Sequence, residues 1–307
     1  MSRSCRSTFA ELTLGLALLL GARTAGAQAC CAGSGAVTPA RLGVHDDALV
    51  GAQARFAGHL GSHDPDGAFV PTPAHARELD FEQTVFGAVR VQPRAQVSLL
   101  VPFVATHRRA SGRASTGGGL GDLNLAARWD PVLAGEASLV PGIGLLAGVT
   151  LPTGRTAEDA EKPMATDATG IGAVQVNGGL ALEQSFGAWF VGLSGLFSIR
   201  QPRTVRSMRM TLAPQLTVLA ATGWAFGSGA TAALVASYTV EGEARVDGVP
   251  IPASARRVVS ASIAGTIPLS DQLRMVGSIF ANPPLPSFGL NQPVTAGVTL
   301  GLLWSFS

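Results

Sequence analysis

The chain has 307 residues, of which 47% are hydrophobic and 14% are charged, and its mean hydropathy is +0.31. An ordinary soluble domain is about 25% charged, so the composition argues against that class. A net charge of +2 at pH 7, with no run of basic residues, argues against a nucleic-acid partner. Helical membrane proteins need apolar runs of about 18 residues or more, and the compact apolar run Leu12–Leu20 is too short.

The N-terminus has the features of an export signal. Arg3 and Arg6 precede the apolar run, and a cleavage motif of small residues ends at Ala27. This order of a basic, an apolar and a small-residue region is typical of a secretory signal peptide. We therefore expect residues 1–27 to be removed, with an uncleaved anchor helix as the alternative.

Residues 28–47 precede the first patterned segment. They are expected to be a periplasmic tail or to fold inward as a plug, and the sequence leaves both alternatives open. Cys30 and Cys31 are adjacent, so a disulfide between them would be strained. The sequence around them lacks the usual leucine of a lipidation box, and it assigns the pair no role.

Residues 48–307 form a succession of segments in which apolar and small or polar residues alternate. In the last segment, every even position from Val294 to Phe306 is apolar. Strands in soluble domains have about 5–6 residues, whereas a strand tilted across the outer membrane needs about 9–11. The twelve segments lie near 48–60, 78–92, 94–107, 121–130, 137–151, 171–184, 187–201, 208–222, 228–241, 256–268, 271–281 and 293–306. They predict an all-β fold, a transmembrane antiparallel up-and-down β-barrel of about 12 strands.

The connections and the aromatic residues support this topology. Long and short connections alternate, which is typical of barrels with short periplasmic turns and longer outer loops. The predicted strands place Trp129, Trp189, Trp224 and Trp304 at their periplasmic ends. Phe81, Phe103, Phe197 and Tyr238 fall near the opposite ends, as expected for two aromatic belts. We expect a location in the outer membrane of a Gram-negative cell, with membrane lipid and the barrel assembly machinery as partners.

Charged side chains fall on the face that the alternation turns inward. A charge on the lipid face costs about 2–4 kcal/mol at mid-membrane, so the fold requires this placement. The inward charges either form a salt-bridge lattice that fills the lumen or line a polar path for a solute. The candidate lumen-lining residues are Arg55, Glu82, Arg90, Asp122, Arg128, Glu183, Arg200, Arg209 and Arg274.

Three weaker patterns bear on catalysis and cofactors. His59, His63 and Asp64 could bring metal ligands into the first outer loop, but we expect a solvated loop and no metal. Gly142–Gly148 matches a loose dinucleotide pattern inside a strand, with no helix after it, so no cofactor is expected. His107 near Ser111 is the one candidate for a catalytic pair at the rim, and we expect no catalytic residues and no enzyme.

The stretch Gly117–Pro131, followed by Gly142–Arg155, resembles the outer-membrane barrels grouped as transporters of the phenol meta-degradation pathway. The matching positions are Gly119, Gly121, Asp122, Leu125, Arg128, Trp129 and Leu151–Gly154. The resemblance implies passage of small, often hydrophobic or aromatic compounds. Both motifs fall at one rim of one predicted hairpin, with Asp122 turned inward near the mouth.

The function expected from these features is an outer-membrane channel or transporter that lets small, hydrophobic or aromatic solutes pass without coupled energy. The alternative is a structural or surface-binding barrel whose lumen is filled by salt bridges and whose outer loops do the work. The sequence does not name the small-molecule solute.

Overall fold

The computed structural model describes residues 40–136, 140–205 and 207–307. The predicted signal peptide and both Cys30 and Cys31 lie outside the described residues. Among the described residues, no helix is long and apolar enough to cross a bilayer.

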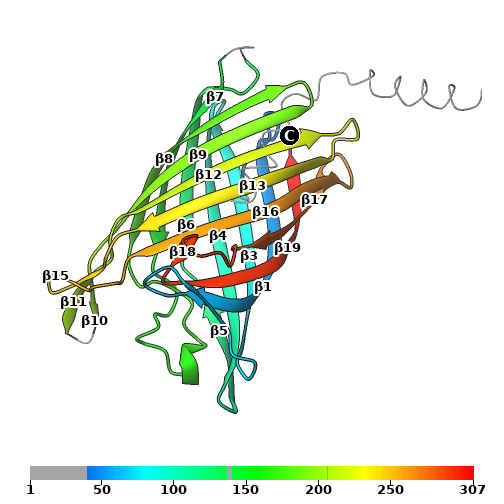
Figure 1. Ribbon diagram of the computed structural model, residues 1–307. Coiled ribbons are helices and arrows are strands. Elements are labelled where there is room, and N and C mark those ends of the chain that lie inside the picture. Colours follow the sequence, from blue (N-terminus) through cyan, green and yellow to red (C-terminus); the bar gives the residue numbers. More distant parts are fainter. Residues whose placement is uncertain (1–39, 137–139, 206) are drawn as a thin grey trace, which may run out of the picture.

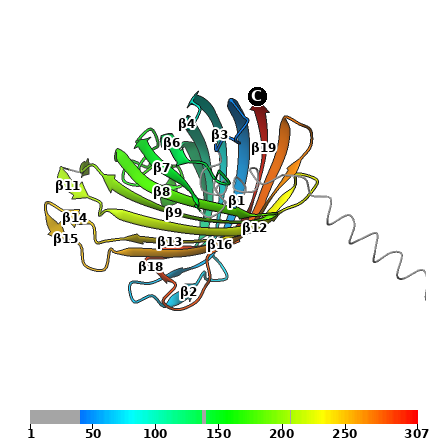
Figure 2. The same ribbon diagram turned by 90° about the horizontal axis from the view of Figure 1, so that it is seen from above.

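The wall of the molecule is one antiparallel sheet that closes on itself (Figure 1). Its strands are β1 (Ala48–His63), β3 (Arg77–Gln92), β4 (Ala95–Ala110), β6 (Leu123–Val132), β7 (Gly142–Leu151), β8 (Gln175–Phe186), β9 (Trp189–Arg200), β12 (Gln215–Ala225), β13 (Thr231–Glu241), β16 (Arg256–Pro268), β17 (Leu273–Ala281) and β19 (Gln292–Phe306). Each strand pairs with the next one along the chain, and β1 pairs with β19 (Figure 2). The predicted fold, a 12-stranded up-and-down barrel, is confirmed.

Shorter elements gather at the end of the barrel away from the C-terminus (Figure 1). They are β2 (Phe69–Pro71), β5 (Arg113–Leu120), the single-turn helix η1 (Pro163–Ala165), β10 (Arg203–Val205), β11 (Met208–Thr211), β14 (Arg245–Val246), β15 (Val249–Pro250) and β18 (Gly289–Leu290). β5 forms a hairpin with β4, and β10, β11, β14 and β15 form a separate four-stranded sheet. This end carries the longer connections, so it is the outer end, and the short turns mark the periplasmic end.

One predicted strand is divided in the structure. The alternation suggested a single strand near 208–222, but β11 ends at Thr211 and β12 begins at Gln215. Pro214 lies in the break, and proline has no N–H to donate to a strand ladder. β11 therefore leaves the wall and joins the small outer sheet.

The barrel strands turn alternate side chains toward lipid. In β19, Leu300, Leu302 and Trp304 are 57%, 50% and 40% exposed, whereas Ser305 is 5% exposed. All four tryptophans are exposed at the periplasmic ends of their strands, and Trp189 lies directly opposite Trp224 in the β9–β12 pairing. A closed sheet with an apolar outer face satisfies its backbone groups without water, as a membrane-spanning barrel must.

Part of the interior near the periplasmic end is packed with apolar side chains. Phe190 and Phe86 are 1% and 2% exposed, and each belongs to a buried apolar cluster. Gly51 lies opposite Phe86 in the β1–β3 pairing, and a Cβ there would lie 2.7 Å from the Phe86 ring. The glycine therefore makes room for an inward aromatic ring.

Candidate functional site

A cavity of about 290 Å³ lies inside the barrel. It is lined by inward residues of β1, β13, β16, β17 and β19, mostly small ones. The hydroxyl-bearing residues among them include Ser237, Ser260, Ser262, Thr266, Ser278 and Thr299. Small side chains on the inner face of these strands leave the space, and the volume is close to that of small-molecule sites.

Two arginines bring positive charge to this cavity. Arg55 of β1 holds its guanidinium carbon 4.3 Å from the centre of the Phe280 ring, a cation–π contact. Arg274 of β17 places Nη1 3.4 Å from a carboxylate oxygen of Asp46. The cavity thus presents hydroxyl groups, apolar carbon and localised positive charge to a solute.

A buried ion cluster occupies the opposite wall. The Glu183 carboxylate of β8 accepts hydrogen bonds from both terminal nitrogens of Arg41. Its Oε2 also lies 3.2 Å from Nη2 of Arg128, and the same nitrogen lies 2.7 Å from Asp130. The side chains of Arg128 and Glu183 are 9% and 7% exposed, so each charge relies on its partners.

A second network lies nearer the outer end of the same wall. Arg200 of β9 donates to Glu241 at 2.6 Å and to the side-chain oxygen of Gln175 at 2.8 Å. It also donates to Gln215. The side chains of Arg200 and Glu241 are 8% and 9% exposed. Salt bridges and polar side chains of these two networks fill part of the lumen.

Residues 40–47 pass along the inner face of the barrel. Arg90 of β3 donates to the backbone carbonyls of Gly43 at 2.6 Å and Asp46 at 2.8 Å. Gln96 of β4 accepts from the N–H of Leu42 at 3.1 Å and donates to the carbonyl of Ala40 at 3.0 Å. Leu42 and Ala40 are 5% and 2% exposed within the Phe86 cluster. This segment contributes to the lining of the cavity, so it narrows the lumen.

Asp122 joins the two sequence motifs at the outer rim. Its carboxylate accepts the backbone N–H of Gly154 at 2.9 Å and that of Ile171 at 2.8 Å. The hydroxyl of Thr153 donates to the carbonyl of Gly121 at 2.7 Å and accepts the N–H of Leu123 at 3.0 Å. Asp122 therefore fixes the loop between β7 and β8 at the rim.

That loop folds back over the β4–β5 hairpin. Lys162 donates to the carbonyl of Thr116 at 2.9 Å, and Thr169 donates to that of Leu120 at 2.6 Å. Burial by itself would raise the pKa of the Asp167 carboxyl. The backbone N–H groups of Glu161 and Lys162 and the Arg155 guanidinium outweigh it and lower the pKa from 3.8 to about 2.

Two of the predicted lumen residues, Glu82 and Arg209, belong neither to these networks nor to the cavity lining. Glu82 of β3 lies opposite Arg55 in the β1–β3 pairing and accepts a hydrogen bond from Thr84 at 3.0 Å. Arg209 does not lie on the barrel wall, because β11 belongs to the small outer sheet, and its side chain is exposed there. Its assignment to the lumen was wrong because the sequence pattern runs across the break at Pro214.

The structure separates His59, His63 and Asp64, which the sequence analysis had grouped in the first outer loop. His59 contacts Glu78 and Asp80, while the Asp64 carboxylate accepts the backbone N–H groups of Asp66 and Ala68 in its own turn. His63 is 4% exposed and packs on the Phe69 ring. His59, His63 and Asp64 thus have separate surroundings.

At the rim, Nδ1 of His107 lies 2.8 Å from the hydroxyl of Thr116. The sequence had suggested Ser111 as the partner of this histidine. Ser111 occupies the β4–β5 turn with a φ of 49°.

Several contacts were missed by the sequence. Arg41 and Asp46 fall in residues 28–47, for which the sequence left open a periplasmic tail or an inward plug. The contact of Arg108 with Glu78, to which it donates at 2.8 Å, was not predicted. The period-two pattern could have indicated that Glu78, Asp80 and Arg108 share the inner face of neighbouring strands. Which residues lie opposite one another depends on strand register, and a single sequence does not give it.

Comparison with solved structures identifies similar barrels. An outer membrane channel from Pseudomonas putida F1 shares 16% identity and covers 85% of this chain and 96% of its own, with a TM-score of 0.70. The beta domain of the Bordetella autotransporter BrkA shares 10% identity over 85% of this chain and 100% of its own, with a TM-score of 0.49. The NanC porin shares 7% identity over 83% and 100%, with a TM-score of 0.47. Comparison with curated proteins finds no match.

The first of these structures shows that the chain has the fold of an outer membrane channel. Residues 63–282 match the family described as "Putative MetA-pathway of phenol degradation". Both motifs that carried the resemblance, 117–131 and 142–155, lie within this range. The chain therefore belongs to this family, and its closed barrel with an apolar outer face places it in the outer membrane.

Proposed function

We propose that the protein lets small hydrophobic or aromatic solutes pass through the outer membrane along its lumen. The observation that carries the proposal is the cavity of about 290 Å³ inside the barrel, lined by small hydroxyl and apolar side chains. The family description, which refers to phenol degradation, agrees with this solute class.

The chemistry of the lining favours a solute with an apolar ring and one polar substituent. Val276 and Phe280 supply apolar contact for a ring, and Ser260 and Ser262 supply hydroxyl groups for the substituent. Arg55 adds a hydrogen-bond donor beside the Phe280 ring. Each contact is weak by itself, which suits passage because a solute that binds tightly leaves slowly.

The passage is proposed to be driven by the solute's own gradient, with residues 40–47 as the constriction at the periplasmic end. Arg90, Gln96 and Glu183 hold this segment on the inner wall. A narrow lumen of this kind selects by size and polarity and carries little ion current.

A second candidate function is a structural or surface-binding barrel. The buried networks around Glu183 and Arg200 favour this function, because they fill the lumen along one side of the barrel. It requires that solutes do not pass and that the outer loops alone bind a partner.

The decisive experiment uses two neighbouring positions of β16. Ser262 lines the cavity, while Ile263 is 62% exposed on the lipid face. Proteoliposomes are assayed for uptake of phenol and of a sugar, and uptake by protein-free liposomes is subtracted because phenol also crosses the lipid. Ser262→Trp fills the cavity and is expected to lower phenol uptake at least about tenfold, whereas Ile263→Trp leaves it unchanged.

If the unaltered protein gives no uptake above protein-free liposomes, the passage is refuted and the surface-binding function stands. Deletion of the outer sheet residues 203–211 then serves as the complementary measurement. Lost partner binding with unchanged permeability would support the second function.

A further inference from the structure

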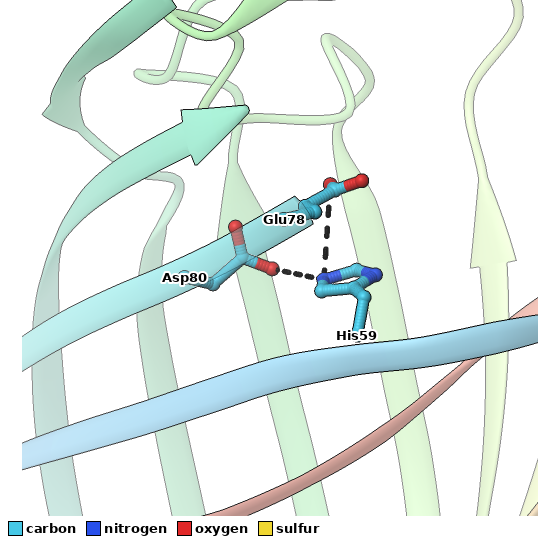
Figure 3. A group of neighbouring side chains, drawn as sticks. All are labelled: His59, Glu78 and Asp80. Atoms are coloured by element: carbon cyan, nitrogen blue, oxygen red, sulfur yellow. Dashed lines mark hydrogen bonds and ion pairs between the residues drawn. The ribbon is translucent and has the colours of Figure 1, made fainter. Parts of the chain in front are cut away.

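We propose that His59, Glu78 and Asp80 bind a divalent transition-metal ion, of the class of Zn²⁺, on the inner wall near the outer mouth. Figure 3 shows the three side chains turned toward one another, His59 from β1 and the two carboxylates from β3. The site is separate from the cavity proposed for solute passage, whose lining contains none of these residues.

Strand geometry explains why the three side chains meet. Glu78 and Asp80 are two positions apart on β3, so both project from the same face of the sheet. In the β1–β3 pairing, Gly58 lies opposite Leu79 and Ala57 opposite Asp80. His59 follows Gly58 and projects from the inner face, so its ring reaches the space between the two carboxylates.

The distances suit a bound ion. Nε2 of His59 lies 2.7 Å from Oδ2 of Asp80 and 3.7 Å from Oε1 of Glu78. One ligand atom from each residue lies within 4.8 Å of the other two. Ligand atoms at about 2.0–2.2 Å from a metal ion are about 3–3.5 Å apart at common coordination angles, so small side-chain shifts close the site.

The donor set indicates the class of ion. One imidazole nitrogen with two carboxylate oxygens suits zinc, nickel or copper ions, whereas calcium and magnesium prefer oxygen ligands alone. Three protein ligands leave at least one position for water. The three side chains are 12%, 27% and 28% exposed, so an ion can reach them from the lumen.

Neighbouring residues on β4 orient the carboxylates. The Thr106 hydroxyl donates to Oδ1 of Asp80 at 2.8 Å, which leaves Oδ2 directed toward His59. Such hydrogen bonds from outside the ligand set fix ligand orientation and often change metal affinity 10- to 100-fold, roughly.

Arg108 competes with the ion. Its Nε and Nη2 lie 2.8 Å and 2.7 Å from Oε1 of Glu78, the oxygen nearest His59. Two carboxylates outweigh one guanidinium, so the cluster attracts a cation, but the ion must take Glu78 from Arg108. Because of this competition, Arg108→Gln is expected to raise the affinity for the metal. A cluster that serves only as an ion-pair network would show no such increase.

The experiment titrates untagged, detergent-solubilised protein with zinc chloride in a calorimeter. One ion per chain is expected to bind. His59→Ala and Asp80→Asn are each expected to weaken binding at least about 100-fold, because each removes a ligand. His107→Ala is the matched control, since this histidine lies at the same end but bonds Thr116. Arg108→Gln strengthens binding.

Heat-modifiable migration in gel electrophoresis shows whether each variant forms the barrel, and His59→Gln replaces His59→Ala if the latter does not. Equal zinc affinity in the unaltered protein and in a folded His59 variant overturns the proposal, as does the lack of saturable binding. Because binding is measured at equilibrium without solute, the result is independent of the uptake assay.

Discussion

Arg41 and Glu183 are 142 positions apart in the chain, yet both terminal nitrogens of Arg41 donate to the Glu183 carboxylate inside the barrel. The contact holds residues 40–47 against the inner wall. Because Arg128 shares the same carboxylate, loss of Glu183 would take this ion-pair partner from Arg41 and leave Arg128 paired with Asp130.

Glu183→Gln is therefore expected to destabilise the barrel by about 3–5 kcal/mol, since removal of one member of a buried ion pair leaves uncompensated charge. The measurement is urea unfolding in detergent, followed by tryptophan fluorescence. Glu136→Gln is the control, because Glu136 pairs with Arg94 at the surface and such pairs contribute about 0–1 kcal/mol. Equal effects of the two substitutions would contradict the buried role of Glu183.

Deleting residues 40–46 is expected to widen the periplasmic end and raise single-channel conductance in planar bilayers. The reason is that this segment lines the cavity while bonded to Arg90 and Gln96. Unchanged conductance in a folded deletion variant would show that the constriction lies elsewhere.

Asp122→Asn is expected to loosen the loop between β7 and β8. An amide oxygen replaces the carboxylate that accepts the N–H groups of Gly154 and Ile171, and a hydrogen bond to a charged group contributes about 1.5–3 kcal/mol. Limited proteolysis of intact cells or proteoliposomes measures the effect as faster cleavage within residues 155–170. Thr153→Ser keeps the hydroxyl that bonds Gly121 and should leave the cleavage rate unchanged.

The outer loop is expected to loosen in acid. The pKa of Asp167 is lowered from 3.8 to about 2, so the ionised carboxyl stabilises the folded loop at higher pH. This contribution is complete above pH about 4 and is lost as the pH falls toward 2. Pepsin digestion across this range should accelerate as the pH falls, relative to a reference substrate. Asp167→Asn should remove most of the pH dependence, and an unchanged profile would refute the role of this carboxyl.

A charge should be tolerated on one face of β19 and not on the other. Leu300→Arg places a charge in the lipid and is expected to cost about 2–4 kcal/mol at mid-membrane. Thr299→Arg directs the same side chain into the cavity, where water reaches it, so the barrel should fold with little loss. The folded fraction after dilution into detergent micelles compares them, and equal yields would contradict the orientation of β19.

The local features of this fold could be predicted from the sequence. In β19, alternation of Leu300, Leu302 and Trp304 with small residues identifies the strand and its lipid face, because successive side chains of a strand point to opposite sides. The rim of the β6–β7 hairpin could likewise be predicted, because Asp122 directly precedes one strand and Leu151–Gly154 ends the other. The matching fold and family confirm the predicted barrel and the family resemblance.

The tertiary structure alone decided which side chains meet. Glu183 bonds Arg41 and His59 contacts Asp80 only because closure of β1 on β19 and the β1–β3 register bring them together. At Pro214 the strand is broken, so Arg209 lies in the small outer sheet and not on the barrel wall. Period-two alternation specifies the face of each residue but not its neighbour, since register is fixed by pairing between strands and not within one.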